Sequence, residues 1–532
     1  MANSNEIYIP AEKFRFTNRN DLQHDSKFST KPVSYFQGAF RRFSKNKGAV
    51  VGGIVICFLV IFALLGPLFT PYTPAEYDQM YAYVSPRLNL FYESGLDFWD
   101  GYKVVENSYS LFLKDRALAQ ETGREIIKRN EYEVSEDGST YTYRYDTYFG
   151  VGFGKYKTIS PEEFLDIQRY QNETGRQVLY PTVMVSKRPT VEKNKYDANI
   201  YYVMENPNGS KITPKLDLNG NIIPNYWKYE ADSPSPLIPE YNSLRIEGED
   251  GIWENGKQYY YAYGRKIDGG IEVRAEYYEY YIYEHTQKAK YDYDDVTEPL
   301  FIFGTTNTGK DILACLSYGA RFSFIFATVV AVTNFIVGVI WGSIAGYFGG
   351  KIDLAMERFT EILGAVPSMI IISLLKYHMG PSPHAHMLVL FIAFFATGWI
   401  GMAGRTRMQF YRFKNQEYVL AARTLGARDA RIMFKHIFPN GLGTIVTSFA
   451  LAIPSMIYSE TSLSYLEIIN LEAGSITSVG TLIAQGKDAI VNHASYVALF
   501  PCLFLTLMML SFNLFGNGLR DAFNPSLRGS ED

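Results

Sequence analysis

The chain has 532 residues, of which 20% are charged, and its formal net charge is −4 at pH 7. Averages of this kind are typical of a soluble globular protein, but here they combine two different sequences. Residues 92–297 carry 35 acidic and 25 basic side chains and 28 of the 42 tyrosines, whereas the rest of the chain carries 20 acidic and 26 basic ones and is rich in apolar runs. The three cysteines lie in or just before apolar runs and outside this block, which excludes a disulfide framework for it.

Six apolar runs are candidate membrane spans, for which about 20 residues are needed. The third is short and ends at Lys376. A mostly polar stretch of more than thirty residues precedes the first run, so we expect this run to remain as an anchor rather than to act as a cleavable signal. The six runs are Ala49–Phe69, Phe322–Phe348, Thr360–Leu375, Met387–Ala403, Leu442–Ser459 and Tyr496–Phe515.

Basic residues predict the orientation, because loops on the cytoplasmic side are enriched in Lys and Arg. Arg41, Arg42, Lys45 and Lys47 precede the first span, which predicts a cytoplasmic N-terminus and, after six spans, a cytoplasmic C-terminus. The fold class is therefore a polytopic α-helical membrane protein with a mixed, mostly β extracellular domain inserted between spans 1 and 2. The expected parts are a cytoplasmic N-terminus (1–47), the first span (48–70), the insert (71–300, core 92–297), a five-span core (301–516) with a cytoplasmic loop (405–440), and a tail (517–532).

A short helix is expected ahead of the first span. Tyr35, Phe36, Phe40 and Phe43 recur with helical spacing beside basic residues, a pattern typical of a helix that lies in the membrane interface. An ordinary charged flank remains the alternative.

The insert is predicted to be mostly β. Alternating runs occur at Tyr141–Phe149 and Ile271–Tyr283, and Lys257–Tyr263 with the Asp268-Gly269 turn predicts a hairpin with the second run. Helices are expected near Ser110–Lys128 and from Ser160, where Pro161 and Glu163 form a capping pattern, to about Gly175. The tyrosines indicate either a binding surface or strands with one buried face. No catalytic residue and no metal site is predicted.

The segment Gly304–Asp311 matches the spacing of a phosphate-binding loop. That motif needs Ser or Thr after its lysine to bind magnesium, and here Asp311 follows Lys310. We therefore interpret the segment as an external turn leading into the second span.

Small residues and prolines mark the spans that pack or bend. Gly338, Gly342 and Gly346 form a face that lets two helices approach closely, and Gly398, Gly401 and Gly404 form a similar one. Prolines interrupt the third, fifth and sixth spans, where each favours a bend. The candidate hinge or translocation-path residues are Pro367, Ser368, Met369, Pro454, Glu460 and Pro501.

The polar, basic segment 417–440 lies between two apolar runs. Small residues at Ala421, Ala422 and Gly426 would let another protein approach the backbone closely. The segment is therefore predicted to be a cytoplasmic docking loop.

This segment resembles the EAA loop of bacterial ABC importer permeases. Further residues resemble the oligopeptide/dipeptide/nickel branch, and the OppC-type subunit in particular. The match includes Glu417, Ala421, Ala422, Gly426, Ile432, His436, Ile437, Pro439 and Asn440, the segment around Phe303–Arg321, Glu460–Leu466, and the tail around Phe512–Pro525. Two features depart from it: Glu467–Asn470 replaces a Gly-rich turn, and the insert after Asn89 is absent from typical members.

The resemblance implies a type I ABC importer permease core in a bacterial cell membrane. The implied partners are a second permease, two cytoplasmic ATPases, an extracellular binding protein and membrane lipid, with no nucleic acid. ATP and magnesium would belong to the ATPases, and the chain itself would need no cofactor and would not be an enzyme. The implied coupling residues are Glu417, Ala421, Ala422, Arg423, Leu425, Gly426 and Arg428.

Peptides are the expected substrate. Nickel, glutathione or an oligosaccharide remains open within the family. A surface receptor and a secondary transporter are remote alternatives. A secondary transporter would need buried titratable groups, and Glu460 is the one acid expected deep in a span.

Overall fold

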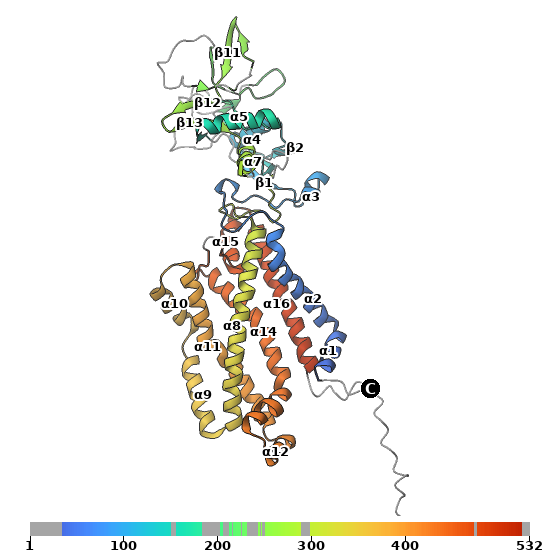
Figure 1. Ribbon diagram of the computed structural model, residues 1–532. Helices are drawn as coiled ribbons and strands as arrows, with labels where there is room; N and C mark the ends of the chain where they lie inside the picture. The colour runs from blue at the N-terminus through green and yellow to red at the C-terminus, as the bar shows by residue number, and fades with distance from the viewer. Residues whose placement is uncertain are drawn as a thin grey trace, which may run out of the picture.

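The computed structural model describes residues 35–150, 156–182, 203–205, 212–214, 216–224, 226–230, 243–244, 246, 250–288, 298–472 and 476–523. A bundle of long helices forms one part, and the β-rich insert stands on one end of it (Figure 1). The short helix α12 lies at the opposite end of the bundle.

Among the residues that the structure describes, five helices are long and apolar enough to cross a membrane, or six spans if the bent pair α9–α10 counts as one. The second span begins earlier than predicted, so that Cys315 lies inside α8 rather than before it. The fourth also continues beyond its predicted end, to Phe413. The helices are α1 (Tyr35–Lys45), α2 (Lys47–Leu65), α8 (Ile312–Phe348), α9 (Gly350–Gly364), α10 (Ser368–Met379), α11 (Pro383–Phe413), α12 (Glu417–Thr424), α13 (Asp429–Arg431), α14 (Phe438–Tyr465), α15 (Val479–Val491) and α16 (Tyr496–Phe523).

Close backbone contact joins α8 to α11. A Cβ atom added to Gly342 would lie 2.2 Å from the Ala403 carbonyl oxygen, and one added to Gly338 or Gly346 would lie under 3 Å from α11 atoms. On α11 the small-residue prediction is correct for Gly398 only, because a Cβ atom at Gly401 or Gly404 would meet no atom within 4 Å. Three glycines of α8 therefore create this contact.

The third apolar run is broken. Helices α9 and α10 meet at an angle of 63°, and Pro367 lies at the break as the N-cap residue of α10. Proline has no N–H to donate, which favours the end of one helix and the start of another at this point. Pro454 and Pro501 lie inside the continuous helices α14 and α16 instead.

The helix α1 packs along the C-terminal end of α16, which is the end of the bundle away from the insert (Figure 1). The rings of Phe43 and Phe515 lie 5.2 Å apart, and Arg42 Nε donates to the Ala522 carbonyl at 3.0 Å. Phe40 is exposed, whereas the side chains of Tyr35 and Phe36 lie outside the described residues.

The insert combines small antiparallel sheets with helices. Its sheets have the orders β1-β3-β2, β10-β11-β8, β4-β13-β12-β9 with β5 beside β13, and β6-β7. The turn η2 (Gly66–Leu68) continues the first span. The helices and turns of the insert are η3 (Gln79–Tyr81), α3 (Asn89–Ser94), α4 (Tyr109–Thr122), α5 (Pro161–Thr174) and α7 (Tyr277–Lys288). Its strands are β1 (Tyr102–Ser108), β2 (Ile127–Val134), β3 (Thr140–Asp146), β4 (Tyr156–Ile159), β5 (Leu179–Tyr180), β6 (Val203–Glu205), β7 (Ile212–Pro214), β8 (Lys228–Glu230), β9 (Ser243–Leu244), β10 (Ile252–Glu254), β11 (Lys257–Tyr261), β12 (Gly264–Ile267) and β13 (Gly270–Ala275).

Three predictions for the insert were wrong. The predicted strand Ile271–Tyr283 is shorter than expected. Strand β13 ends at Ala275, and helix α7 follows it. Residues 278–283 are all buried, with Tyr278, Tyr281 and Ile282 in one apolar cluster and Tyr280 and Tyr283 in another, so the run has no single apolar face that would distinguish a helix from a strand. The Asp268-Gly269 turn joins β13 to β12 rather than to β11, which pairs with β10 and β8. Helix α4 ends at Thr122, because Gly123 has a left-handed conformation there.

The predicted helix from Ser160 to Gly175 is correct. Ser160 accepts a hydrogen bond from the Glu163 backbone N–H, and Gly175 ends the helix with φ +69°. The Glu163 carboxylate accepts a bond from the Tyr280 hydroxyl at 2.6 Å, and this bond fixes α5 against α7.

Aromatic residues join the insert to the bundle. The buried Tyr81 lies 5.7 Å from Phe301 between ring centroids, and the Tyr83 backbone N–H donates to the Thr306 carbonyl at 3.0 Å. The Tyr148 hydroxyl contacts the Phe301 backbone at 3.2 Å. These contacts pack the insert on the segment that leads into α8, and Trp99 also stacks on Phe500 of α16 at 5.7 Å, so the insert is packed on the bundle rather than tethered to it.

Candidate functional site

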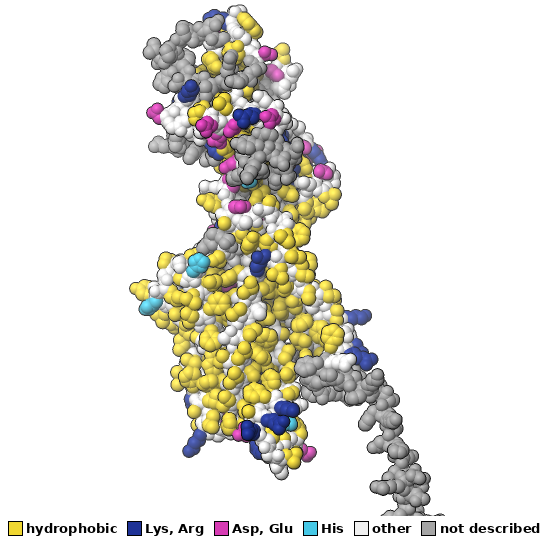
Figure 2. Space-filling model, in the orientation of Figure 1, with side chains coloured by type: hydrophobic (Ala, Val, Ile, Leu, Met, Phe, Trp, Pro, Cys, Tyr) yellow, Lys and Arg dark blue, Asp and Glu magenta, His cyan; other side chains and the backbone are white. Residues whose placement is uncertain are grey.

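The segment between α11 and α14 is a short exposed helix held on a buried base. Val419 of α12, Ile432 and Ile437 are completely buried with Phe410 of α11 and Tyr347 of α8. One face of α12 is thereby fixed to three other helices. Figure 2 places a group of basic side chains at this end of the molecule.

A left-handed residue ends α12. Gly426 has φ +79°, and its N–H donates to the Arg423 carbonyl at 3.0 Å. The Ala427 N–H reaches back to the Ala422 carbonyl at 3.0 Å. Because only glycine adopts this conformation readily, Gly426 sets the direction in which the chain leaves α12.

Tyr347 connects the two sides of this turn. Its hydroxyl donates to Asp429 Oδ1 at 2.5 Å, and Arg423 Nη2 donates to the same hydroxyl at 3.3 Å. Arg423 is therefore engaged within the chain, whereas Arg428 is exposed at the start of α13.

The outward face of α12 is available to another protein. Glu417, Ala421 and Leu425 follow at four-residue intervals and are all exposed, with Leu425 at 87%. Ala422 is half-buried beside them. An exposed leucine next to a small residue on a rigid helix is suited to insertion into a groove.

The next segment contains a feature that the sequence reasoning missed. Residues Ile432–Ile437 form a π-helical stretch, in which the Phe438 N–H donates to the Met433 carbonyl. Pro439, which has no N–H, follows immediately. Wide turns of this kind are frequent at functional sites.

A charge network beside the loop was also missed. Arg407 of α11 donates to both Asp353 oxygens of α9 at 2.6 and 2.7 Å and to both Glu357 oxygens at 2.9 and 2.8 Å. Tyr411 also donates to Asp353. The partners lie about fifty positions apart in the sequence, so that only the presence of two acids four residues apart on α9 could have indicated the network.

The remaining predicted path residues do not form one cluster with the loop. Pro367, Ser368 and Met369 are exposed at the α9–α10 break. Glu460 is completely buried near the insert-side end of α14, where it accepts hydrogen bonds from Ser464 at 3.1 Å and Ser323 at 3.4 Å. It therefore joins α14 to α8.

The segment that resembles a phosphate-binding loop is a packed turn. A Cβ atom at Gly309 would lie 1.7 Å from the Asp78 carbonyl oxygen, and Lys310 pairs with Glu472 at 2.6 Å. Asp311 is buried, caps α8 and accepts a bond from Thr70 at 2.7 Å. These contacts show that the segment has a structural role where the insert meets the start of α8.

Comparison with known proteins identifies the class. Residues 338–529 match the family of binding-protein-dependent transport system inner membrane components, and residues 34–86 match the N-terminal transmembrane domain of oligopeptide transport permease C. Neither model covers residues 87–337.

Individual relatives agree with these matches. The oligopeptide transport system permease protein OppC of Bacillus subtilis (strain 168) is 41% identical over 226 residues, which are 42% of this chain and 72% of that protein. The dipeptide transport system permease protein DppC of the same organism is 38% identical over 42% of this chain and 69% of that protein. OppC of Haemophilus influenzae is 31% identical over 56% of this chain and 96% of that protein.

The chain therefore belongs to the binding-protein-dependent transport permeases of ABC transporters and is of the OppC type. It is a multi-pass helical membrane protein.

Proposed function

We propose that this chain is one of two permease subunits in an ATP-driven importer of extracellular peptides. The related proteins named above are permeases of oligopeptide and dipeptide transport systems, which supports peptides as the substrate class. In this proposal two cytoplasmic ATPases supply the energy, with ATP and magnesium bound to them, and an extracellular binding protein delivers the peptide.

The single observation that carries the coupling proposal is the construction of α12. Its Glu417–Ala421–Leu425 face is exposed, while Val419 on the opposite side is buried in a cluster with Tyr347 of α8, Phe410 of α11 and the π-helical segment that continues into α14. A displacement of this helix by a docked ATPase would therefore be transmitted to three long helices, because packed interiors transmit strain rather than absorb it.

The orientation of the chain in the membrane follows from assigning α12 as the helix that docks with the ATPase. The α12 end faces the cytoplasm with both termini, and the insert faces outward, in agreement with the basic residues beside the first span. The insert would then meet the binding protein or the arriving peptide.

The break between α9 and α10 is the proposed entry to the translocation path. Pro367, Ser368 and Met369 are exposed there in the single chain, and α10 leaves α9 at 63°. A second permease packed against this region would enclose a path between the two subunits.

The coupling proposal is tested by Ala421→Arg in the complete importer in proteoliposomes. Ala421 is exposed, so the chain should fold normally, but the added side chain should prevent close approach of the ATPase. We expect the ATPase to be lost on purification and peptide uptake to be abolished. Ala75→Arg, the same change at an exposed position of the insert, is the control and should change neither. Retention of the ATPase and normal uptake in Ala421→Arg would refute the docking role of α12.

A further inference from the structure

Residues 89–99, here called the arm, connect the bundle junction to the first strand of the insert. The arm comprises α3 and the loop after it. Leu90 is 73% exposed, Leu96 54% and Phe98 65%, with Phe91 and Trp99 half-buried beside them. A single exposed leucine needs no explanation, but three large apolar side chains within nine residues form a patch.

The insert-side edge of the membrane can be located along the first span. The candidate span Lys47–Leu68 has 22 residues, which at about 1.5 Å per residue is about 33 Å, close to the thickness of the hydrocarbon core. Leu68 and the neighbouring Phe69 are 79% and 71% exposed. They mark the level at which the apolar core ends.

The arm lies near this level. Phe62 of α2 faces Phe504 of α16 at 6.0 Å between ring centroids, and Phe500 is one turn, about 5–6 Å, closer to the insert. Trp99 of the arm stacks on Phe500 at 5.7 Å and on Phe303 at 6.1 Å. Trp99 is therefore at the edge of the membrane, where tryptophan is enriched in membrane proteins.

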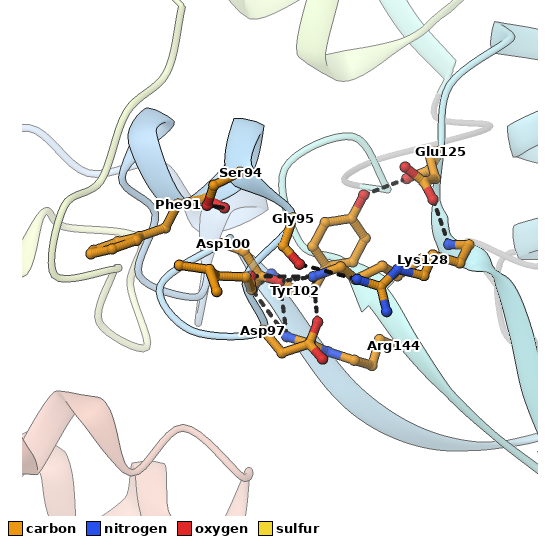
Figure 3. Close-up of polar contacts among 11 residues, drawn as sticks. Phe91, Ser94, Gly95, Asp97, Asp100, Tyr102, Glu125, Lys128 and Arg144 are labelled. Atoms are coloured by element: carbon orange, nitrogen blue, oxygen red, sulfur yellow. Dashed lines mark hydrogen bonds and ion pairs between the residues drawn. The ribbon is translucent and has the colours of Figure 1, made fainter.

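Ion pairs hold the arm to the sheet of the insert (Figure 3). Lys128 of β2 pairs with Asp97 at 2.6 Å and with Asp100 at 2.5 Å, and Arg144 of β3 pairs with both acids. The arm contains two carboxylates, Glu93 and Asp97. The ion pairs balance the negative charge of Asp97. A fixed arm loses little conformational entropy when its apolar side chains meet a surface.

We propose that the arm is a membrane-surface anchor, in which Leu90, Leu96 and Phe98 enter the leaflet on the insert's side. Lipid is favoured over a protein partner because Trp99 of the arm stacks on Phe500 near the level at which the first span ends. Figure 2 shows hydrophobic surface continuing from the bundle onto the adjoining part of the insert. The anchor would hold the insert at a fixed height and tilt above the membrane, a role independent of the proposed transport function.

The test places an environment-sensitive fluorophore on Leu90→Cys and Phe98→Cys, one site at a time. The exposed Cys57 and Cys502 are replaced by alanine, and the buried Cys315 is retained. The labelled chain, in the complete importer, is placed in nanodiscs whose lipids carry nitroxide quenchers at the headgroup or the upper acyl chain. Trp253→Cys on β10, 70% exposed in the sheet farthest from the bundle in Figure 1, is the matched control.

We expect both arm labels to lose most of their fluorescence to the lipid quenchers, while the control label keeps its fluorescence. Arm labels quenched no more than the control label would overturn the proposal. If those labels were also shielded from aqueous iodide, a protein surface would cover the arm, and the lipid assignment would be equally refuted. Neither result depends on transport activity, so failure here is distinguishable from failure of the proposed function.

Discussion

The bundle and the insert are held together by different interactions. In the bundle, α8 and α11 approach so closely that a Cβ atom at Gly342 would lie 2.2 Å from a carbonyl oxygen. In the insert, the fully buried Arg274 pairs with Glu121 at 2.6 Å, and Arg124 pairs with Glu276 at 2.7 Å. Lipid removes the hydrophobic drive between helices, so a membrane bundle relies on close packing, whereas a water-exposed domain buries aromatic surface and pairs the charges that it encloses.

The largest effect should come from a charge of the insert. Arg274→Met removes the partner of the buried Glu121 and should destabilise the insert by about 3–5 kcal/mol, since an unpaired buried charge is costly. Rapid proteolysis confined to the insert would report this, with the bundle remaining protected. Arg169→Met removes an exposed pair with Asp166 and should have little effect. Equal protection of the Arg274→Met and wild-type inserts would contradict the distinction between the two regions.

A smaller effect is expected from overpacking the bundle. Gly342→Leu forces α8 away from α11 and should lower the stability of the bundle by about 3 kcal/mol, at the upper end for inserted core side chains. The thermal unfolding midpoint of the detergent-solubilised chain measures this change. Gly401→Leu is the matched control, because a Cβ atom there meets no atom within 4 Å. The packing account fails if both variants unfold at the same temperature as the wild type.

The smallest effect concerns the pH dependence of the insert. Burial raises the pKa of Asp115 from its usual range to about 6, although its carboxylate accepts a bond from Tyr143. The folded insert holds this proton more tightly than the unfolded chain does, so protonated Asp115 stabilises the fold. This contribution to the free energy of unfolding is fully present below about pH 4 and is lost as pH rises to about 6. The loss amounts to about 2 kcal/mol. Asp115→Asn should remove the share of the decline that Asp115 causes, while burial of Asp146, whose pKa is also raised to about 6, leaves the remainder. Thermal midpoints from pH 4 to 7 would measure it, and an unchanged slope in the variant would exclude Asp115 as its source.

Local chemistry made some elements predictable from the sequence. Ser160 and Gly175 delimit α5 because a serine cap and a left-handed glycine act within one turn of the helix. Gly426 ends α12 for the same reason. The glycines of α8 likewise indicate helix contact at any position along a span, although which helix they meet is decided by the fold.

Elements that depend on distant partners were not predictable. Helix α7 was predicted as a strand, because a run of tyrosines satisfies both periodicities, and two separate clusters of distant residues bury the helix from both sides. The network of Arg407 with Asp353 and Glu357 joins α11 to α9 across about fifty residues. Glu467, where the family resemblance implied a Gly-rich turn, adopts φ +59° and makes the turn without glycine.

The proposed contact of α12 with an ATPase is tested most directly by site-specific cross-linking. Leu425→Cys, with Cys57 and Cys502 replaced by alanine, places one reactive thiol on the exposed face of α12. Leu218→Cys, fully exposed in the insert, provides the control. We predict that a short bifunctional reagent joins position 425, and not position 218, to the ATPase in native membranes. Absence of that product, in a variant that still imports peptide, would contradict the coupling role of α12.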